Sequence, residues 1–358
     1  MKILCVIDSL RSGGAQRQLV NLAIAFQNKE HQVEFLVYHS DSFYYEILQE
    51  NNIKIIEILE NNYIKRIFKM RKVIRNGNYN AVLSFLEAAS FISTLAGFPY
   101  RKWNLVIGER SANPNIFKSF KLKMYRWFHL FVTAIVSNSH ENLKIVRKIN
   151  PLLGESKLYV IYNLIDFDTW KPSSTEYIYR KNGKFNLTVV ASHQYLKNLN
   201  GLVEAVNLLD DCEKKQLIIN WYGDVLDNSK FEAMEKIKKY HLEDIFNFHD
   251  ATNEISSKVN AADAVGLFSF YEGLPNAICE AMVNAKPIIS SNISDVNLFL
   301  NNDYIFEPDQ LLDIANKIKL LLSLDQFSLM QIGQKNRNLA LKVFFEDEIV
   351  KQYISIMS

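Results

Sequence analysis

Two glutamates bracket a segment whose residue types suit the recognition of phosphates and hydroxyl groups. Seven residues separate Glu272 from Glu280, and Pro275 lies between them. Proline favours the first turn of a helix, because its missing N–H would have no helical acceptor there. Glu272 is therefore expected in a loop, and Glu280 about one and a half turns inside the helix that follows.

The start of that helix is the second part of the pattern. The amides of Asn276 and Ala277 should point out of the helix, where oriented donors and the helix dipole attract phosphate. At about 1.5 Å rise per residue, Glu280 lies on the order of 7 Å along the axis from Pro275, close to the reach from a pyrophosphate to a ribose. One carboxylate can then hold ribose hydroxyls and the other a sugar beyond the phosphates, which indicates a nucleotide sugar. Two solvated glutamates beside a helix start are an equally compatible interpretation.

Short apolar runs alternate with helical stretches along the 358 residues, a pattern typical of parallel sheets covered on both faces. The expected strands are 3–7, 33–38, 53–58, 81–85, 105–107, 134–137, 158–161, 186–191, 216–222, 264–268 and 287–289. The expected helices include 15–28, 199–208, 231–240, 275–284 and a long terminal stretch at 326–356.

This alternation predicts an α/β protein with two Rossmann-like, doubly wound parallel-sheet domains. The rhythm breaks at 166–184, which contains Trp170, Pro172 and Gly183 and is expected to be a linker. We therefore expect an N-terminal domain at 1–165, which faces the acceptor and a membrane, and a C-terminal nucleotide-sugar domain at 185–335. The last segment, 336–358, is expected to return to the first domain.

A resemblance to a known family supports the interpretation of the glutamate pair. Glu272 to Asn276, together with Glu280, resemble the signature of family 4 of the retaining GT-B glycosyltransferases. The segments 8–17, 160–166, 189–198 and 287–291 are similar to other segments of that family in order and spacing. The resemblance covers nearly the whole chain and implies a GT-B fold, in which two Rossmann-like domains face each other across a cleft.

The resemblance also implies roles for individual residues. Glu280 would bind the ribose, Glu272 the transferred sugar, and Lys197 would neutralise the diphosphate, so Lys197 and Glu272 are the catalytic candidates. The full set expected to bind the donor is Gly13, Gly14, Lys197, Asn198, Glu272, Gly273, Leu274, Pro275, Asn276 and Glu280. Family members often carry an arginine five residues before the phosphate lysine, but this chain has Ser192 there. Neutralisation of the diphosphate would then depend more on Lys197 and the helix start.

Two further candidates lie in the first half of the chain. Gly13 and Gly14 follow the first strand and let backbone amides approach a phosphate or an acceptor, although a bare tight turn is equally compatible. They do not form a G-x-G-x-x-G dinucleotide fingerprint. Glu109 and Arg110 follow another strand, where open sheets bind ligands, and are candidates for an acceptor hydroxyl and an acceptor phosphate. A structural ion pair between them is equally compatible.

Metal sites and disulfides find little support in the sequence. Asp166-Phe167-Asp168 is an Asp-x-Asp, but it stands alone at the expected linker and is better explained as a turn. The seven histidines show no metal-ligand spacing, so no metal and no cofactor besides the donor is expected. Three cysteines in separate apolar segments favour a reducing compartment.

Charge is distributed unevenly along the chain. Residues 1–170 hold 22 Lys and Arg against 14 Asp and Glu, whereas the remainder holds 19 against 25. Two basic, aromatic-rich stretches, 65–75 and 116–131, suit peripheral docking on anionic lipid. The alternative is a core-facing amphipathic helix, in which Phe117, Phe120, Met124, Trp127, Phe128 and Phe131 form the buried arc. No nucleic-acid-binding motif accompanies the charge. No segment suits a signal peptide or a membrane span, so a cytoplasmic protein, peripheral on the inner face of the plasma membrane, is expected.

Together these observations predict a metal-independent, retaining hexosyltransferase. It would move a sugar from a nucleotide sugar, expected to be a UDP-sugar, to a lipid-linked saccharide during bacterial synthesis of a surface polysaccharide such as capsule or lipopolysaccharide O-antigen. Two alternative functions are compatible with the same fold. One is a nucleotide-sugar epimerase or a phosphorylase, and the other is a non-catalytic scaffold that binds nucleotide sugars.

Overall fold

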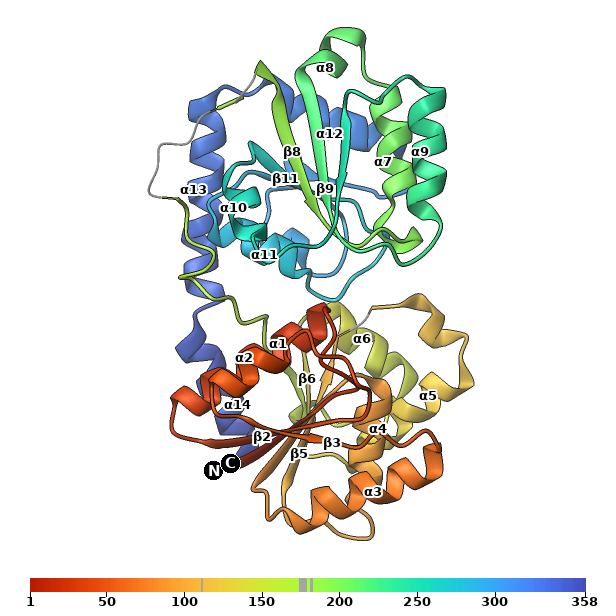
Figure 1. The fold of residues 1–358 in the computed structure, drawn as a ribbon, viewed down its shortest axis with the longest axis vertical. Coiled ribbons are helices and arrows are strands. Elements are labelled where there is room, and N and C mark those ends of the chain that lie inside the picture. Colours follow the sequence, from red (N-terminus) through yellow and green to blue (C-terminus); the bar gives the residue numbers. More distant parts are fainter. Residues whose placement is uncertain (111, 174–178, 181–182) are drawn as a thin grey trace. The chain divides into compact units, whose positions relative to one another are not determined.

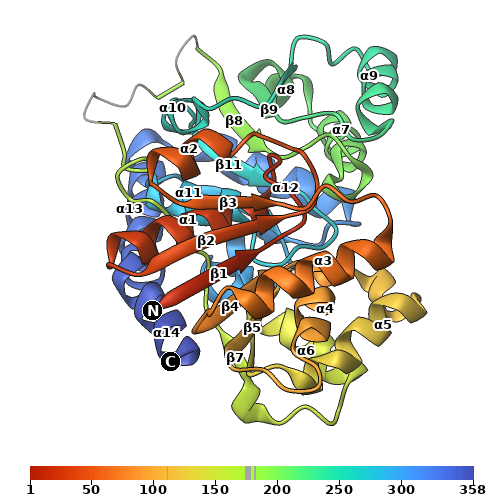
Figure 2. The same cartoon turned by 60° about the horizontal axis from the view of Figure 1, so that its bottom comes forward.

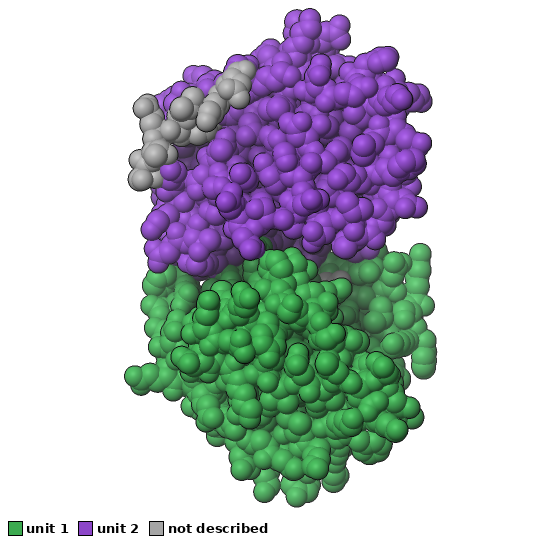
Figure 3. Space-filling model, in the orientation of Figure 1, with its two compact units in different colours: residues 1–164, 345–358 green, residues 165–344 purple. Residues whose placement is uncertain are grey.

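The apolar runs form the strands of two separate parallel sheets, as their alternation with helices predicts. The computed structural model describes residues 1–110, 112–173, 179–180 and 183–358. This part of the chain divides into unit 1, residues 1–164 and 345–358, and unit 2, residues 165–344 (Figure 3). Of the linker expected at 166–184, residues 174–178 and 181–182 lie outside the described residues.

Unit 1 is built on a seven-stranded sheet in the order β3-β2-β1-β4-β5-β6-β7 (Figure 2). All of its strand pairs are parallel. The strands are β1 Lys2–Val6, β2 Gln32–Val37, β3 Lys54–Glu57, β4 Ala81–Phe85, β5 Asn104–Glu109, β6 Ala134–Ser137 and β7 Leu158–Val160.

Helices cover both faces of this sheet, which explains why its strands are apolar on both sides. They are α1 Gly14–Asn28, α2 Tyr45–Glu50, α3 Tyr63–Asn76, α4 Glu87–Ala96, α5 Phe120–Trp127, α6 His140–Ile149 and α14 Glu346–Met357 (Figure 1). One core cluster packs α1 and α14 on the face that carries Ile3 and Cys5. A second cluster packs α3, α4 and α6 on the face that carries Leu4 and Val6.

Unit 2 repeats the same design with six parallel strands in the order β10-β9-β8-β11-β12-β13. These are β8 Phe185–Val190, β9 Leu217–Tyr222, β10 Phe246–His249, β11 Ala264–Leu267, β12 Ile288–Ser291 and β13 Ile305–Phe306. Its helices are α7 Leu199–Asn207, α8 Asp211–Gln216, α9 Ser229–Lys239, α10 Ile255–Asn260, α11 Asn276–Val283, α12 Leu311–Ser323 and α13 Gln326–Val343. The largest core cluster of this unit packs α7, α9 and α12 on one face of the sheet.

Each sheet has one place where the strand order reverses. The reversal lies between β1 and β4 in unit 1, and between β8 and β11 in unit 2. The connections that follow two such strands leave toward opposite faces, so a crevice opens at their carboxyl ends, where open α/β sheets bind ligands. In unit 1 these connections are residues 7–13 and Leu86; in unit 2 they are residues 191–198 and 268–275.

The terminal helical stretch expected at 326–356 is two helices that belong to different units. In unit 2, α13 packs so closely on the turn after α11 that a Cβ added at Gly333 would lie 1.9 Å from the carbonyl oxygen of Ala285. Asn336 Nδ2 also donates to the Lys286 carbonyl at 2.9 Å. The C-terminal segment that returns to unit 1 therefore begins at Phe345 and not at residue 336.

Candidate functional site

Lys197 and Glu272 lie 75 residues apart in sequence and meet at the reversal point of unit 2. Lys197 Nζ contacts Glu272 Oε1 directly, and the Ser269 hydroxyl donates to the same oxygen at 2.9 Å. Burial of the pair is incomplete, since the two side chains are 16% and 17% exposed. A cation and a carboxylate that neutralise each other at a ligand-binding edge can exchange partners when a charged ligand arrives.

Helix α11 begins beside Glu272, at the position where the glutamate pattern predicts a helix. Pro275 is the residue before its first turn rather than a member of it, and the Pro275 carbonyl accepts hydrogen bonds from the amides of Ile278 and Cys279. The amides of Asn276 and Ala277 lie ahead of these hydrogen bonds, at the end of the helix that the backbone dipoles make positive. Glu280 follows in the second turn and is buried, with 3% exposure.

Asn198 holds the shape of the loop that carries Lys197. Its backbone is left-handed, with φ of 56°. Its side-chain oxygen accepts from the Gly201 amide at 3.2 Å, which caps α7, and its Nδ2 donates to the Pro308 carbonyl at 2.7 Å. These contacts fix the residue next to Lys197, so the structure gives Asn198 a part in positioning the loop. Ser192, which stands in place of the expected arginine, accepts from Gln194 Nε2 at 2.7 Å.

Aromatic residues that the sequence analysis did not single out as site residues flank the Lys197–Glu272 pair. Tyr195 is 71% exposed, and its ring lies 5.2 Å from that of Phe270. Burial raises the pKa of the Tyr271 phenol, as do the nearby Glu272 carboxylate and Tyr195. No spacing rule marks these residues, because their exposure depends on how two loops from distant parts of the sequence come together.

In unit 1, Gly13 and Gly14 follow β1 and lead into α1, as predicted, and this connection lies at the reversal point of the sheet. Gly13 precedes α1 in an extended conformation, and a Cβ there would lie 2.3 Å from Gln16 Oε1. Gln16 Nε2 in turn donates to Asp8 Oδ1 at 2.9 Å. The small residue therefore lets the first turn of α1 bind back to the end of β1.

Glu109 and Arg110 do not pair with each other. Glu109 is 6% exposed, and it accepts from Arg126 Nη2 at 2.8 Å, with His129 Nε2 at 3.5 Å. Burial raises the pKa of Glu109 to about 6, against the opposing effect of Arg126. Burial and the Arg126 charge lower the pKa of His129 to about 3, so its imidazole is neutral.

Arg110 is held by a different set of groups. Its guanidinium donates to the Tyr353 hydroxyl at 2.6 Å and to Asn163 Oδ1 at 3.2 Å, and it lies 4.1 Å from the centre of the Phe85 ring. The structure thus commits both candidates for the acceptor to contacts inside unit 1. The ion pair considered between them is not formed.

The alternative interpretation of 116–131, in which an aromatic arc is buried, is wrong. Phe120 is 83% exposed, and Trp127 and Phe131 are 45% and 48% exposed. The buried side of α5 carries Tyr125 and Arg126 instead. The reason is long-range: α5 rotates to place the Arg126 guanidinium beside Glu109 at the end of β5, which turns several aromatic side chains outward.

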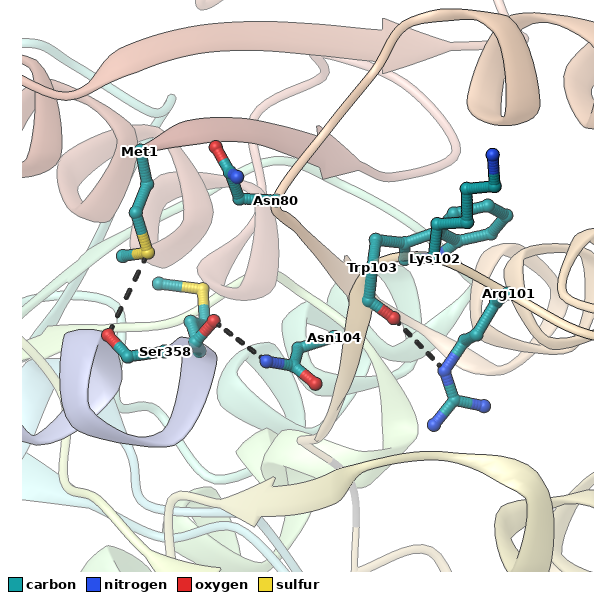
Figure 4. Close-up of a pocket in the computed structure, with 8 residues that line it drawn as sticks. Met1, Asn80, Arg101, Lys102, Trp103, Asn104 and Ser358 are labelled. Carbon is teal, nitrogen blue, oxygen red and sulfur yellow. Dashed lines mark hydrogen bonds between the residues drawn. The ribbon is translucent and has the colours of Figure 1, made fainter.

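A pocket of about 720 Å³ lies at the opposite edge of the unit 1 sheet (Figure 4). It is lined by Met1, Asn80, Arg101, Lys102, Trp103, Asn104, Met357 and Ser358. These positions are near the amino ends of β1, β4 and β5, away from the edge where parallel sheets bind ligands. The Arg101 guanidinium is occupied by Thr133 Oγ1 and by the carbonyls of Trp103 and Phe131.

Among the residues that the structure describes, no three His, Cys, Asp or Glu side chains are grouped so that they could hold a metal ion. Asp166 instead forms a turn, in which its carboxylate accepts from the Asp168 amide at 2.9 Å and from Thr169. None of the described helices has the length and apolar character that a bilayer span requires.

Comparisons with known proteins cover both units. Residues 12–169 match the family profile described as Glycosyltransferase Family 4, and residues 176–339 match that described as Glycosyl transferases group 1. The chain is 24% identical to a Campylobacter jejuni α-1,4-N-acetyl-D-galactosaminyltransferase that acts on a diphosphoundecaprenol-linked saccharide, over 91% of this chain and 90% of that protein. It is also 24% identical to the amylovoran biosynthesis glycosyltransferase AmsD of Erwinia amylovora, over 81% and 80%.

Solved structures show the same architecture. HepE of Anabaena, solved in complex with UDP and glucose, superposes with a TM-score of 0.87 at 18% identity, over 99% of this chain and 98% of that one. The sucrose-phosphate synthase of Thermosynechococcus elongatus superposes with a TM-score of 0.84 at 13% identity, over 99% and 98%. The predicted GT-B fold is therefore confirmed.

Proposed function

Because this chain belongs to glycosyltransferase family 4 and has the GT-B fold, we propose that it transfers a sugar from a UDP-sugar to a lipid-linked saccharide, with retention of anomeric configuration. The product would be an intermediate of a surface polysaccharide. The observation that carries the proposal is the contact between Lys197 and Glu272 at the reversal point of unit 2, beside the start of α11.

The two ends of the donor would bind the two partners of this ion pair. Its diphosphate takes Lys197 and the amides of Asn276 and Ala277 at the start of α11, which frees the Glu272 carboxylate to accept hydrogen bonds from the transferred sugar. Glu280 then holds the ribose hydroxyls from the second turn. The exchange costs little because each partner of the broken pair gains a charge-assisted hydrogen bond to the ligand.

The same groups would lower the barrier to transfer. As the bond between the anomeric carbon and the phosphate oxygen breaks, negative charge grows on the leaving diphosphate, and Lys197 with the α11 amides stabilises it. This supply of positive charge makes a metal ion unnecessary. The leaving phosphate takes the proton of the acceptor hydroxyl, and no protein nucleophile is assigned.

The relatives support the choice of substrates. The Campylobacter jejuni protein and an Escherichia coli galactosyltransferase that is 26% identical over 61% of this chain both act on diphosphoundecaprenol-linked saccharides. The E. coli protein uses UDP-galactose, and HepE was solved with UDP-glucose. A UDP-sugar and a polyprenyl-diphosphate saccharide are therefore the first substrates to test.

The direct experiment measures UDP release from UDP-galactose, UDP-N-acetylgalactosamine and UDP-glucose, with and without N-acetylglucosaminyl-diphosphoundecaprenol in detergent. Release that depends on the acceptor, and that continues in excess EDTA, is the expected result. Conversion of the donor without any acceptor would point to an epimerase, and binding of UDP-sugars without release would point to a scaffold. The anomeric configuration of the product, determined by NMR, tests retention.

Unit 1 would dock on the membrane that holds the acceptor. We call the surface that makes this contact the aromatic–basic surface. It lies on α3, α5 and the residues beside α5, where the nearby Tyr125 contributes, after burial, to a raised pKa of the Tyr63 phenol on α3. Its exposed members are Ile64, Phe68, Phe120, Trp127, Phe131, Lys65, Lys69, Lys72, Lys118 and Lys121. Exposed aromatic residues interleaved with lysines suit the headgroup region of the anionic inner leaflet of a plasma membrane.

Not every basic residue of 65–75 is available to lipid. Arg71 donates to the carbonyls of Leu95, Ala96 and Phe98, and Arg75 donates to those of Ala96, Phe98 and Tyr100. These two arginines cap the end of α4, and Lys69 Nζ binds Glu60 Oε2 at 2.7 Å, so Lys65 and Lys72 carry the charge of this stretch toward lipid. Co-sedimentation with vesicles of phosphatidylglycerol, compared with phosphatidylcholine alone, tests the surface, and equal binding to both would contradict it.

A further inference from the structure

We propose that Glu87 is an acceptor-binding residue, whose carboxylate accepts a hydrogen bond from a hydroxyl group of the saccharide that receives the sugar. The inference rests on the proposed function and names the side chain that holds its second substrate. Its basis is the position of Glu87 at the reversal point of unit 1, its exposure, and its contact with a buried arginine.

The topology places Glu87 at the ligand-binding edge of the unit 1 sheet. Strand β4 ends at Phe85 and α4 begins at Glu87, so Leu86 alone connects them. Since the strand order reverses between β1 and β4, Glu87 and the Gly13 loop border the same crevice. Leu86 makes this turn with φ of 71° and ψ of 151°, a conformation that is essentially reserved for glycine.

Unit 2 shows the same arrangement in its own sheet. Strand β11 occupies the position that β4 has in unit 1, as the neighbour of the first strand on the far side of the reversal. The connection after β11 carries Glu272, and the turn after β4 carries Glu87. Glu87 and Glu272 therefore hold corresponding positions in the two sheets. The proposed function assigns a ligand to Glu272 and none to Glu87.

The surroundings of Glu87 leave its carboxylate open to a ligand. The side chain is 29% exposed, and Glu87 Oε1 lies 3.5 Å from Arg126 Nη2. Arg126 is fully buried and binds Glu109 more closely, at 2.8 Å. The shared guanidinium therefore orients the Glu87 carboxylate but does not cover it.

The neighbouring carboxylates do not have this freedom. Glu109 is sealed between Arg126 and His129. Asp8, at the end of β1, accepts from Gln16 Nε2 at 2.9 Å and from the Ser9 amide at 2.7 Å, which holds the loop before α1. Glu87 is therefore the carboxylate of this edge best placed to meet a sugar hydroxyl.

A Glu87→Gln variant tests this assignment, because it keeps the shape of the side chain and removes the charge. Losing a charge-assisted hydrogen bond should raise the KM for N-acetylglucosaminyl-diphosphoundecaprenol by about 10-fold to 100-fold. The Kd for UDP, measured by calorimetry, should change less than about twofold. Glu87→Asp, which keeps the charge on a shorter side chain, should recover part of the lost affinity for the acceptor.

Glu141→Gln is the matched control, since Glu141 also lies in the first turn of a helix that follows a strand of the same sheet. It should leave the acceptor KM unchanged, which separates a ligand contact from a general effect on a helix start. An active wild-type chain whose Glu87→Gln variant keeps the wild-type acceptor KM overturns the inference. An equal loss of UDP affinity in that variant overturns it as well. A wild-type chain that releases no UDP with any of the three donors instead overturns the proposed function.

Discussion

The two units present charged side chains at corresponding edges of similar sheets, but they use them differently. In unit 2, Lys197 and Glu272 hold each other at the surface, each with about one sixth of its side chain exposed. In unit 1, Arg126 and Glu109 form a comparable pair with exposures of 0% and 7%. The comparison sets the pair of unit 2, for which we propose a ligand, against the pair of unit 1, which is buried inside the unit.

The physical difference is desolvation. A partly exposed pair retains contact with water, so its partners can separate and bind a substrate without a large penalty. A buried pair cannot lose one member, because the remaining charge would be left without compensation.

The largest effect is expected for Arg126→Met, which leaves Glu109 buried without its cation. The free energy of unfolding should fall by about 3–5 kcal/mol in urea titrations, as is typical when one partner of a buried ion pair is removed. The double variant Arg126→Met with Glu109→Gln should recover part of the loss. Wild-type stability of Arg126→Met would show that unit 1 does not depend on this pair.

Lys197→Ala should affect activity rather than stability. The kcat for UDP release should fall about 10²-fold to 10³-fold, as when one preorganised donor to a leaving group is deleted. Lys238→Ala, on the exposed side of α9 in the same unit, is the control and should keep the wild-type kcat. The unfolding midpoint of Lys197→Ala should stay close to that of the wild type, in contrast to Arg126→Met.

The free energy of unfolding should depend on pH through the titration of the Glu109 carboxyl. Its pKa is raised from 4.5 to about 6 by burial, so the folded state binds more protons than the unfolded state between these values. The stabilising contribution of this group is therefore complete below about pH 4.5 and is lost as the pH rises through 6. The loss amounts to about 2 kcal/mol.

Urea titrations of the wild type and Glu109→Gln at several pH values between 4.5 and 7 measure this effect as a difference. The difference in unfolding free energy should change across this window and become constant above it. Parallel curves for the two proteins would mean that the Glu109 carboxyl titrates as it does in the unfolded chain.

The smallest effect is expected at the aromatic–basic surface. Lys121→Gln should weaken binding to phosphatidylglycerol vesicles by about 1 kcal/mol, which is close to fivefold, and less at high salt. Lys238→Gln in unit 2 should leave vesicle binding unchanged. If both variants lost affinity equally, attraction to the vesicles would follow from overall charge and not from a surface of unit 1.

Much of the fold could be predicted from local patterns. The Val, Ile and Leu runs locate eleven of the strands because parallel strands covered on both faces must be apolar along their length. Two strands were not predicted: β10 lies at the edge of its sheet and contains the polar residues Asn247 and His249, and β13 has only two residues. The terminal stretch reads as one helix because nothing in its spacing shows that Gly333 and Tyr353 pack in different units.

The candidate site shows the same contrast between local patterns and long-range packing. The spacing around Pro275 predicted Glu272 in a loop and the start of α11, because both are local properties, whereas Lys197 was predicted from the family resemblance of its segment. Only the tertiary structure decided that Glu109 pairs with Arg126, that Arg110 binds Tyr353, and that Phe120 faces outward. A buried charge takes its partner from whichever element the fold brings beside it, and no spacing along the chain specifies that neighbour.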